Sequence, residues 1–209
     1  GKPVLKVGSK GAFDAAQVIG PCVLFADGLF HMWYGGMDGT LHNGHVGIER
    51  IGLAISKDGI HWERANAGQP VVDIGKPGCY DDIQAAHPCV VREGNAYRMW
   101  YSAYSERADH VFCVATSHDG IHWKRENDGK PVTGLKPERV IGPALHVHRG
   151  KYYMLFSGST DVWTIYSATS RDGIHWQMQN GGRPSVPLGN FGTFDSGQMH
   201  HPCLLAMPG

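Results

Sequence analysis

Ser56–Trp62 reads SKDGIHW, and almost the same seven residues return as SHDGIHW at Ser117–Trp123 and SRDGIHW at Ser170–Trp176. Serine and aspartate side chains satisfy backbone donors in turns, and glycine supplies the positive φ that a tight hairpin needs. The tryptophan that follows then begins a new strand. Three hairpins of one design in one chain predict three repeats of one all-β unit.

The residues around each hairpin predict the unit that repeats. A proline at position 21, 88 or 143 opens a short apolar run, and two further runs lead to the hairpin. The segment after DGIHW supplies a fourth run. Four short runs rich in β-branched and aromatic residues predict a four-stranded antiparallel sheet. The predicted fold is therefore an all-β propeller of four-stranded antiparallel blades.

The 209-residue chain starts and stops inside a repeat. Its first residues, GKPV, match the end of a unit, and its last residues, HPCLLAMPG, match the first strand of one. We expect about three and a half blades, so that either a missing portion of a longer chain or self-association closes the ring. The expected division of the single domain 1–209 is the end of a blade (1–13), three blades (14–75, 76–134, 135–190) and the start of another (191–209).

Composition excludes several classes of protein. Lys plus Arg number 19 and Asp plus Glu number 19, so the formal net charge is zero. This balance argues against a nucleic-acid partner or a basic membrane-binding surface. No apolar run is long enough to cross a bilayer. The five cysteines form no C-x-x-C pair, so we expect no zinc site.

Acidic residues recur in the segments that join one blade to the next. Strand order places these segments opposite the DGIHW hairpins, and each leads into the innermost strand. Three of them share the pattern aromatic-Asp-x-x-Gln-x-x-x-Pro, with Asp14, Asp81 and Asp195. We expect these carboxylates to meet at one end of the axis, where a ligand would bind. In the structural alternative, the aspartates cap the backbone and Gln17 and Gln84 bridge blades.

Residues that interrupt the repeat are stronger functional candidates. A second acid stands beside Asp81, two histidines replace glycines before the strand prolines, and two more histidines alternate along the third inner strand. Trp163 lies in a loop on the same face, where it can stack on a sugar ring or pack in the core. The interrupting residues are Asp82, His87, Glu138, Arg139, His146, His148, His200 and His201.

The blade sequences resemble those of a known superfamily. HPCVVREGNAYRMWYSA (87–103), GPALHVHRGKYYMLFSG (142–158) and ATSRDGIHW (168–176) are similar to the five-bladed propeller glycosidases of glycoside hydrolase families 43, 32 and 130. FDSGQMHHP (194–202) is similar to a blade entry of these enzymes. The resemblance implies a carbohydrate substrate and a five-bladed ring, of which about a blade and a half lies outside this sequence.

The resemblance to family 43 also implies three acids from successive blades and an acid/base hydrolysis. By order along the chain, Asp14 is the base, Asp81 or Asp82 tunes a pKa, and Glu138 is the acid. In family 43 the first Asp directly precedes the strand proline, a place that Gly20 takes here. The expected substrate-binding residues are Gln17, Gln84, His87, Arg139, His146, Trp163, Asp195 and His201.

Two other functions fit the same sequence. A non-catalytic carbohydrate-binding or assembly propeller would explain the displaced acids and the repeated Asp and Gln. An enzyme of another chemistry would use His87, His146 and His148 with a metal ion in the central channel. Apart from that ion, we predict no metal or other cofactor, and a carbohydrate as the partner.

Overall fold

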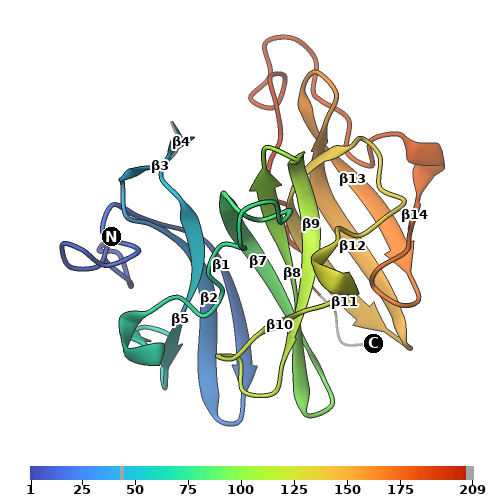
Figure 1. Cartoon of the computed structure of the whole chain (residues 1–209). Coiled ribbons are helices and arrows are strands. Elements are labelled where there is room, and N and C mark those ends of the chain that lie inside the picture. The colour runs from blue at the N-terminus through green and yellow to red at the C-terminus, as the bar shows by residue number, and fades with distance from the viewer. Residues whose placement is uncertain (43–44, 206–209) are drawn as a thin grey trace.

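A computed structural model describes residues 1–42 and 45–205. Its strands form three antiparallel blades side by side around an axis (Figure 1), and one parallel pairing, of Glu49 with Gln84, joins the first two blades into one sheet. The predicted all-β fold with four-stranded antiparallel blades is confirmed. In the part of the chain that is described, no helix has the length and apolar character needed to cross a membrane.

Each blade uses four strands in chain order, with the first strand innermost. The strands of the first blade are β1 (Gln17–Ala26), β2 (Leu29–Met37), β5 (Glu49–Ser56) and β6 (Glu63–Arg64). Those of the second are β7 (Gln84–Glu93), β8 (Ala96–Ser105), β9 (Ala108–Ser117) and β10 (Lys124–Arg125). Those of the third are β11 (Arg139–His148), β12 (Lys151–Ser159), β13 (Trp163–Ser170) and β14 (Trp176–Met178).

Short elements complete the described chain. In the chain segment that links β2 to β5, the two-residue strands β3 (Leu41–His42) and β4 (His45–Val46) pair with each other. A 3-10 turn follows the outermost strand of each blade and leads into the connection to the next one. These turns are η1 (Asn66–Gly68), η2 (Asn127–Gly129) and η3 (Asn180–Gly182).

The DGIHW hairpins join neighbouring blades. Within each hairpin, the Ser and Asp side chains accept backbone N–H groups of the turn, as the sequence predicts. The indole N–H of buried Trp33 on β2 donates to the carbonyl of Gly120 in the next blade at 3.0 Å. Trp100 on β8 donates to Gly173 in the same way, at 2.8 Å. The repeated hairpin is therefore a socket for a tryptophan of the preceding blade.

The innermost strands bend just before their prolines. The pairing of β1 with β2 shifts register between Ile19 and Cys22, and the second and third blades repeat this shift. At the bend, Gly20 has φ 54° and Gly142 has φ 61°. Glycine adopts this left-handed conformation without a steric penalty. The bends bring the backbone of each blade close to the axis.

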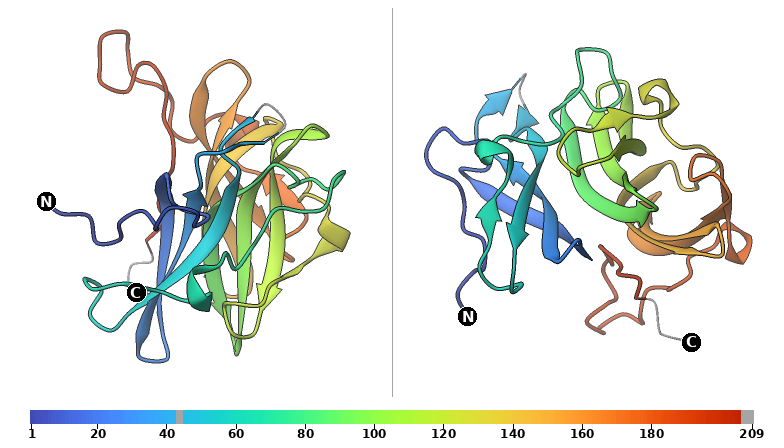
Figure 2. Two further views of the ribbon diagram at one scale, coloured as in Figure 1. Left: turned by 60° about the vertical axis from the view of Figure 1, so that its left-hand side comes forward. Right: turned by 90° about the horizontal axis from the view of Figure 1, so that it is seen from below.

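The residues after η3 return to the open side of the axis. The right-hand view of Figure 2 shows this segment crossing between the first and third blades. Its residues 201–204, together with β1, β7 and β11, line an axial cavity of about 660 Å³. The fold thus leaves one large cavity bounded by all three inner strands, and the functional candidates can be placed against it.

Candidate functional site at the axis

Two histidines, His87 and His201, line the axial cavity at the positions where the other inner strands have glycine. Their rings lie 4.7 Å apart. Both adopt positive φ, 46° for His87 and 54° for His201, which is a strained conformation for a residue with a side chain. A Cβ at Gly142 would lie 2.8 Å from the His201 ring, so glycine there leaves room for it. Strain of this kind is often retained at functional sites.

Three histidines at the axis, His87, His200 and His201, have lowered pKa values, which favour the neutral imidazole. Burial lowers the pKa of His87 to about 4, and the nearby His201, His110 and His200 act in the same direction. Burial also lowers the pKa of His200 and His201. A neutral imidazole offers one hydrogen-bond donor and one acceptor. These imidazoles can therefore donate to one polar group of a ligand and accept from another.

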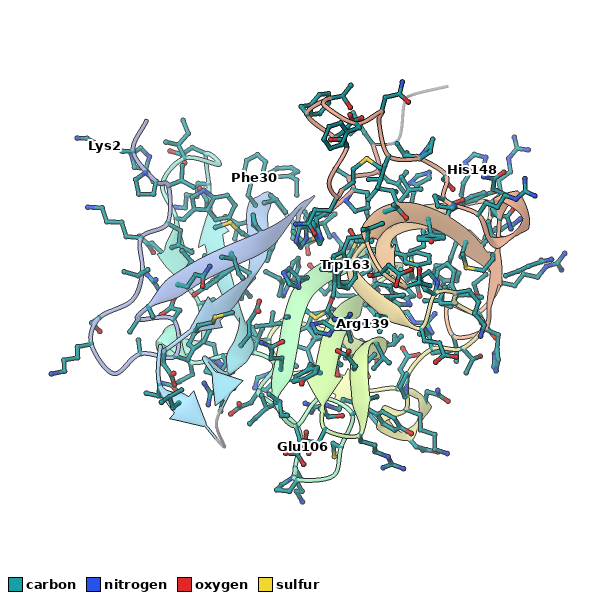
Figure 3. The ribbon with its side chains drawn as sticks, turned by 90° about the horizontal axis from the view of Figure 1, so that it is seen from above. Lys2, Phe30, Glu106, Arg139, His148 and Trp163 are labelled. Atoms are coloured by element: carbon teal, nitrogen blue, oxygen red, sulfur yellow. The ribbon has the colours of Figure 1, made fainter. Side chains whose placement is uncertain are left out.

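Trp163 extends this group into the third blade. Its ring lies 5.3 Å from that of His200 and 6.2 Å from that of His110. The Arg139 guanidinium lies 5.4 Å from the centre of the Trp163 ring, and its Nε is 2.8 Å from Asp109. Figure 3 shows Trp163 and Arg139 together near the middle of the molecule. We call His87, His110, Arg139, Trp163, His200 and His201 the axial cluster.

Half of the predicted substrate-binding residues lie in the axial cluster: His87, Arg139, Trp163 and His201. The other four lie elsewhere. Gln84 begins β7, exposed Gln17 begins β1, His146 lines the cavity farther along β11, and Asp195 accepts a hydrogen bond from Thr193. The role of all eight in binding stays a prediction.

The repeated aspartates are held inside their own blades. The buried Asp81 carboxylate accepts the Tyr101 hydroxyl at 2.8 Å and the Arg125 guanidinium at 2.7 Å. Asp14 makes the equivalent two contacts in the first blade, at 2.9 and 2.8 Å. These contacts suit a structural role, but they join side chains, whereas the structural alternative expected backbone caps. The catalytic roles of Asp14 and Asp81 stay a prediction.

The other two predicted acids have different surroundings. Asp82 Oδ2 accepts the backbone N–H of Gly78 at 2.7 Å, and Oδ1 is buried without a partner among the described residues. The Glu138 side chain is 87% exposed and pairs with Lys136 at 3.3 Å. No contact in the described part of the chain joins two of the four predicted acids.

Sequence analysis missed a buried acid at the seam between the first and second blades. Glu49, the first residue of β5, is 2% exposed, and its Oε1 has no partner among the residues described. Burial raises its pKa to about 8, while the backbone N–H of His87 acts in the opposite direction. A signal was present, because Glu49, His110 and Trp163 stand at the same distance before their hairpin serines.

The metal ion in the central channel, which the alternative enzyme would use, stays a prediction. Within 1–42 and 45–205, no group of three or more His, Cys, Asp or Glu side chains is arranged to hold an ion. The rings of His146 and His148 lie 6.3 Å apart, and Figure 3 shows His148 away from Trp163 and Arg139.

Comparisons with known proteins agree with a carbohydrate-active propeller. Over 213 residues the chain is 29% identical to an uncharacterized protein of Mycobacterium tuberculosis, covering 97% of the chain and 68% of that protein. Over 173 residues it is 29% identical to a 1,2-β-oligomannan phosphorylase of Thermoanaerobacter, covering 79% of the chain and 54% of the enzyme. The chain thus spans between about half and two thirds of these relatives.

The fold is also found in a solved structure, a β-1,2-mannobiose phosphorylase of Listeria innocua in complex with β-1,2-mannobiose. The TM-score is 0.64 at 16% identity, over 87% of this chain and 63% of that one. Residues 42–186 match the sequence profile of the family described as β-1,4-mannooligosaccharide phosphorylase. Of the three families that the sequence resembles, this match selects one: the chain belongs to glycoside hydrolase family 130.

Proposed function

We propose that this chain forms part of a mannoside-active enzyme and that the axial cluster binds the saccharide. Membership of family 130 supports the substrate class. The observation that carries the proposal is the meeting of an aromatic face, a cation and neutral imidazoles beside the axial cavity. Sugar rings bind through such combinations, because they present both apolar faces and hydroxyl groups.

The reaction that we propose is phosphorolysis of a β-mannosidic bond. Inorganic phosphate attacks the anomeric carbon, the bond from this carbon to the glycosidic oxygen breaks, and an acid gives that oxygen a proton. Hydrolysis needs two carboxyl groups beside the scissile bond. Phosphate replaces the second of them, so one acid is enough. This requirement fits a chain whose predicted acids share no contact among the described residues.

We assign roles to the cluster on this basis. Trp163 stacks on a mannose ring, and Arg139 together with the imidazole N–H groups binds hydroxyl or phosphate oxygens. Asp82 is the proposed acid. It stands at the entrance to β7, the strand that carries His87, and one of its oxygens is buried with no partner among the described residues.

The test is incubation of the protein with β-1,2- and β-1,4-mannobiose, with and without inorganic phosphate. We expect mannose 1-phosphate and mannose to form only when phosphate is present. Mannose released at equal rates without phosphate would contradict phosphorolysis and support the hydrolysis that the resemblance to family 43 implies. Saccharide binding without any product would contradict both reactions and support a carbohydrate-binding propeller.

A further inference from the structure

Serine side chains hold the backbone at two bends of the inner strands. Ser102 Oγ on β8 accepts the N–H of Gly142 in the next blade at 3.1 Å. Ser157 Oγ on β12 accepts the N–H of His201 at 2.9 Å. The two serines occupy the same register in their sheets, opposite the third strand. At both of these boundaries between blades, a serine hydroxyl therefore accepts the backbone N–H of the bend.

The first blade differs at this position in two ways: it lacks the serine, and a carboxyl occupies the space. Gly35 stands at the register position of the serines. A Cβ on it would lie 2.0 Å from Oε1 of Glu49, so the missing side chain makes room for the carboxyl. The backbone N–H of His87 donates toward this carboxyl instead of toward a hydroxyl. In the first blade, Gly35 and the buried Glu49 carboxyl thus together take the place of the serine found in the other two blades.

The surroundings of Glu49 in the first blade disfavour the charged form of its carboxyl. Glu49 is 2% exposed, and no cation among the described residues lies against it: β2 presents Gly35, and β7 presents His87, whose pKa is lowered by burial. Arg50, next on β5, pairs with two aspartates instead. A buried carboxyl without a cation keeps its proton. A buried carboxyl lowers stability at a position where a serine hydroxyl could accept the same backbone N–H. Such destabilising groups are typical of functional sites.

We infer that Glu49 is a positioning residue of the axial site, and that its uncharged carboxyl holds His87 in its strained conformation beside the saccharide. The inference rests on the proposed function for its activity measurement. Loss of the Glu49 proton would place an unpaired buried anion at the seam, which the fold relieves by moving the bend that carries His87. The site is then competent only while Glu49 is neutral.

Glu49→Gln tests this role, because glutamine keeps the shape and an acceptor oxygen but cannot ionise. We expect wild-type kcat/KM to fall about tenfold for each pH unit above about pH 8. The Gln variant should keep wild-type activity at pH 7 and lack this alkaline fall, while Glu49→Ala loses at least tenfold at every pH. If Gln proves as inactive as Ala at pH 7, Glu49 is no positioning residue.

A measurement without turnover separates this inference from the proposed function. The folded pKa of Glu49 lies above its unfolded value of about 4.3, so the folded state binds the extra proton between these values and loses stability as pH rises through them. We expect wild type and Glu49→Gln to share one urea midpoint at pH 4, and the variant to have the higher midpoint at pH 8. Equal midpoints at pH 8 would overturn the inference, even if no mannoside is turned over. Glu63→Gln, at an exposed position of β6, should match wild type throughout.

Discussion

Replacing Asp82 by Asn should lower kcat/KM for β-mannobiose phosphorolysis by at least about 100-fold, the usual range for removing a general acid. Asparagine has the size of aspartic acid but cannot deliver a proton to the glycosidic oxygen. Oδ2 of Asp82 accepts the Gly78 N–H, whereas Oδ1 is buried and has no hydrogen-bond partner among the described residues. Initial rates of mannose 1-phosphate formation give this ratio.

Glu138→Gln is the matched control for Asp82→Asn. The Glu138 side chain is 87% exposed and pairs only with Lys136 among the described contacts, so we expect an unchanged rate. A loss of activity in Glu138→Gln with full activity in Asp82→Asn would restore the assignment implied by family 43. It would remove Asp82 from the mechanism.

Replacing Asp81 by Asn should lower the free energy of unfolding by about 3 kcal/mol, the lower end of the cost of breaking a buried ion pair. The change leaves the Arg125 guanidinium and the Tyr101 hydroxyl without the carboxylate that accepts from both, at 2.7 and 2.8 Å. Urea unfolding followed by circular dichroism measures the loss.

Asp195→Asn is the control for Asp81→Asn, because it stands at the same place in the repeat without the tyrosine and arginine partners. Within the described part of the chain, its side chain accepts from Thr193 at 2.7 Å. We expect a change below about 0.5 kcal/mol. If Asp81→Asn leaves stability unchanged and abolishes turnover, its contacts have been misjudged and its predicted catalytic role holds.

The fold could be predicted from sequence because its decisive contacts are local. The side chains of Ser56 and Asp58 accept backbone N–H groups two and three residues ahead, so the hairpin is encoded within its own few residues. The same turn recurs three times, and this repetition makes the propeller recognisable. The socket for Trp33 could not be predicted, because its carbonyl partner lies 87 residues away in another blade.

The site could be predicted only in part. His87, His201 and Arg139 stood out because they interrupt the repeat, and Trp163 because it lies in a loop on the same face. The structure places these four residues together. The surroundings of Asp81 were open, because one sequence pattern suits both an axial acid and a buried ion pair. Its partners lie 20 and 44 residues farther along the chain.

Glu49 shows why the rest of the site was hidden. Glu49 becomes buried, and its carboxyl comes to lie next to Gly35, only when β2, β5 and β7 pack together. In the sequence it stands near the end of the long polar segment 35–50, whose other acid is Asp38. Aligning each chain segment backward from its hairpin serine places Glu49 beside His110 and Trp163, and this alignment is a simple way to find such residues in other propellers.

The most direct test of the account is calorimetric titration of β-mannobiose into wild type, Trp163→Ala and His61→Ala. Loss of a central aromatic contact typically weakens binding by about 2 kcal/mol, or roughly 30-fold in Kd. We predict this loss for Trp163→Ala and an unchanged Kd for His61→Ala, whose side chain is 86% exposed in a DGIHW hairpin. Wild-type affinity in Trp163→Ala would contradict saccharide binding at the axial cluster.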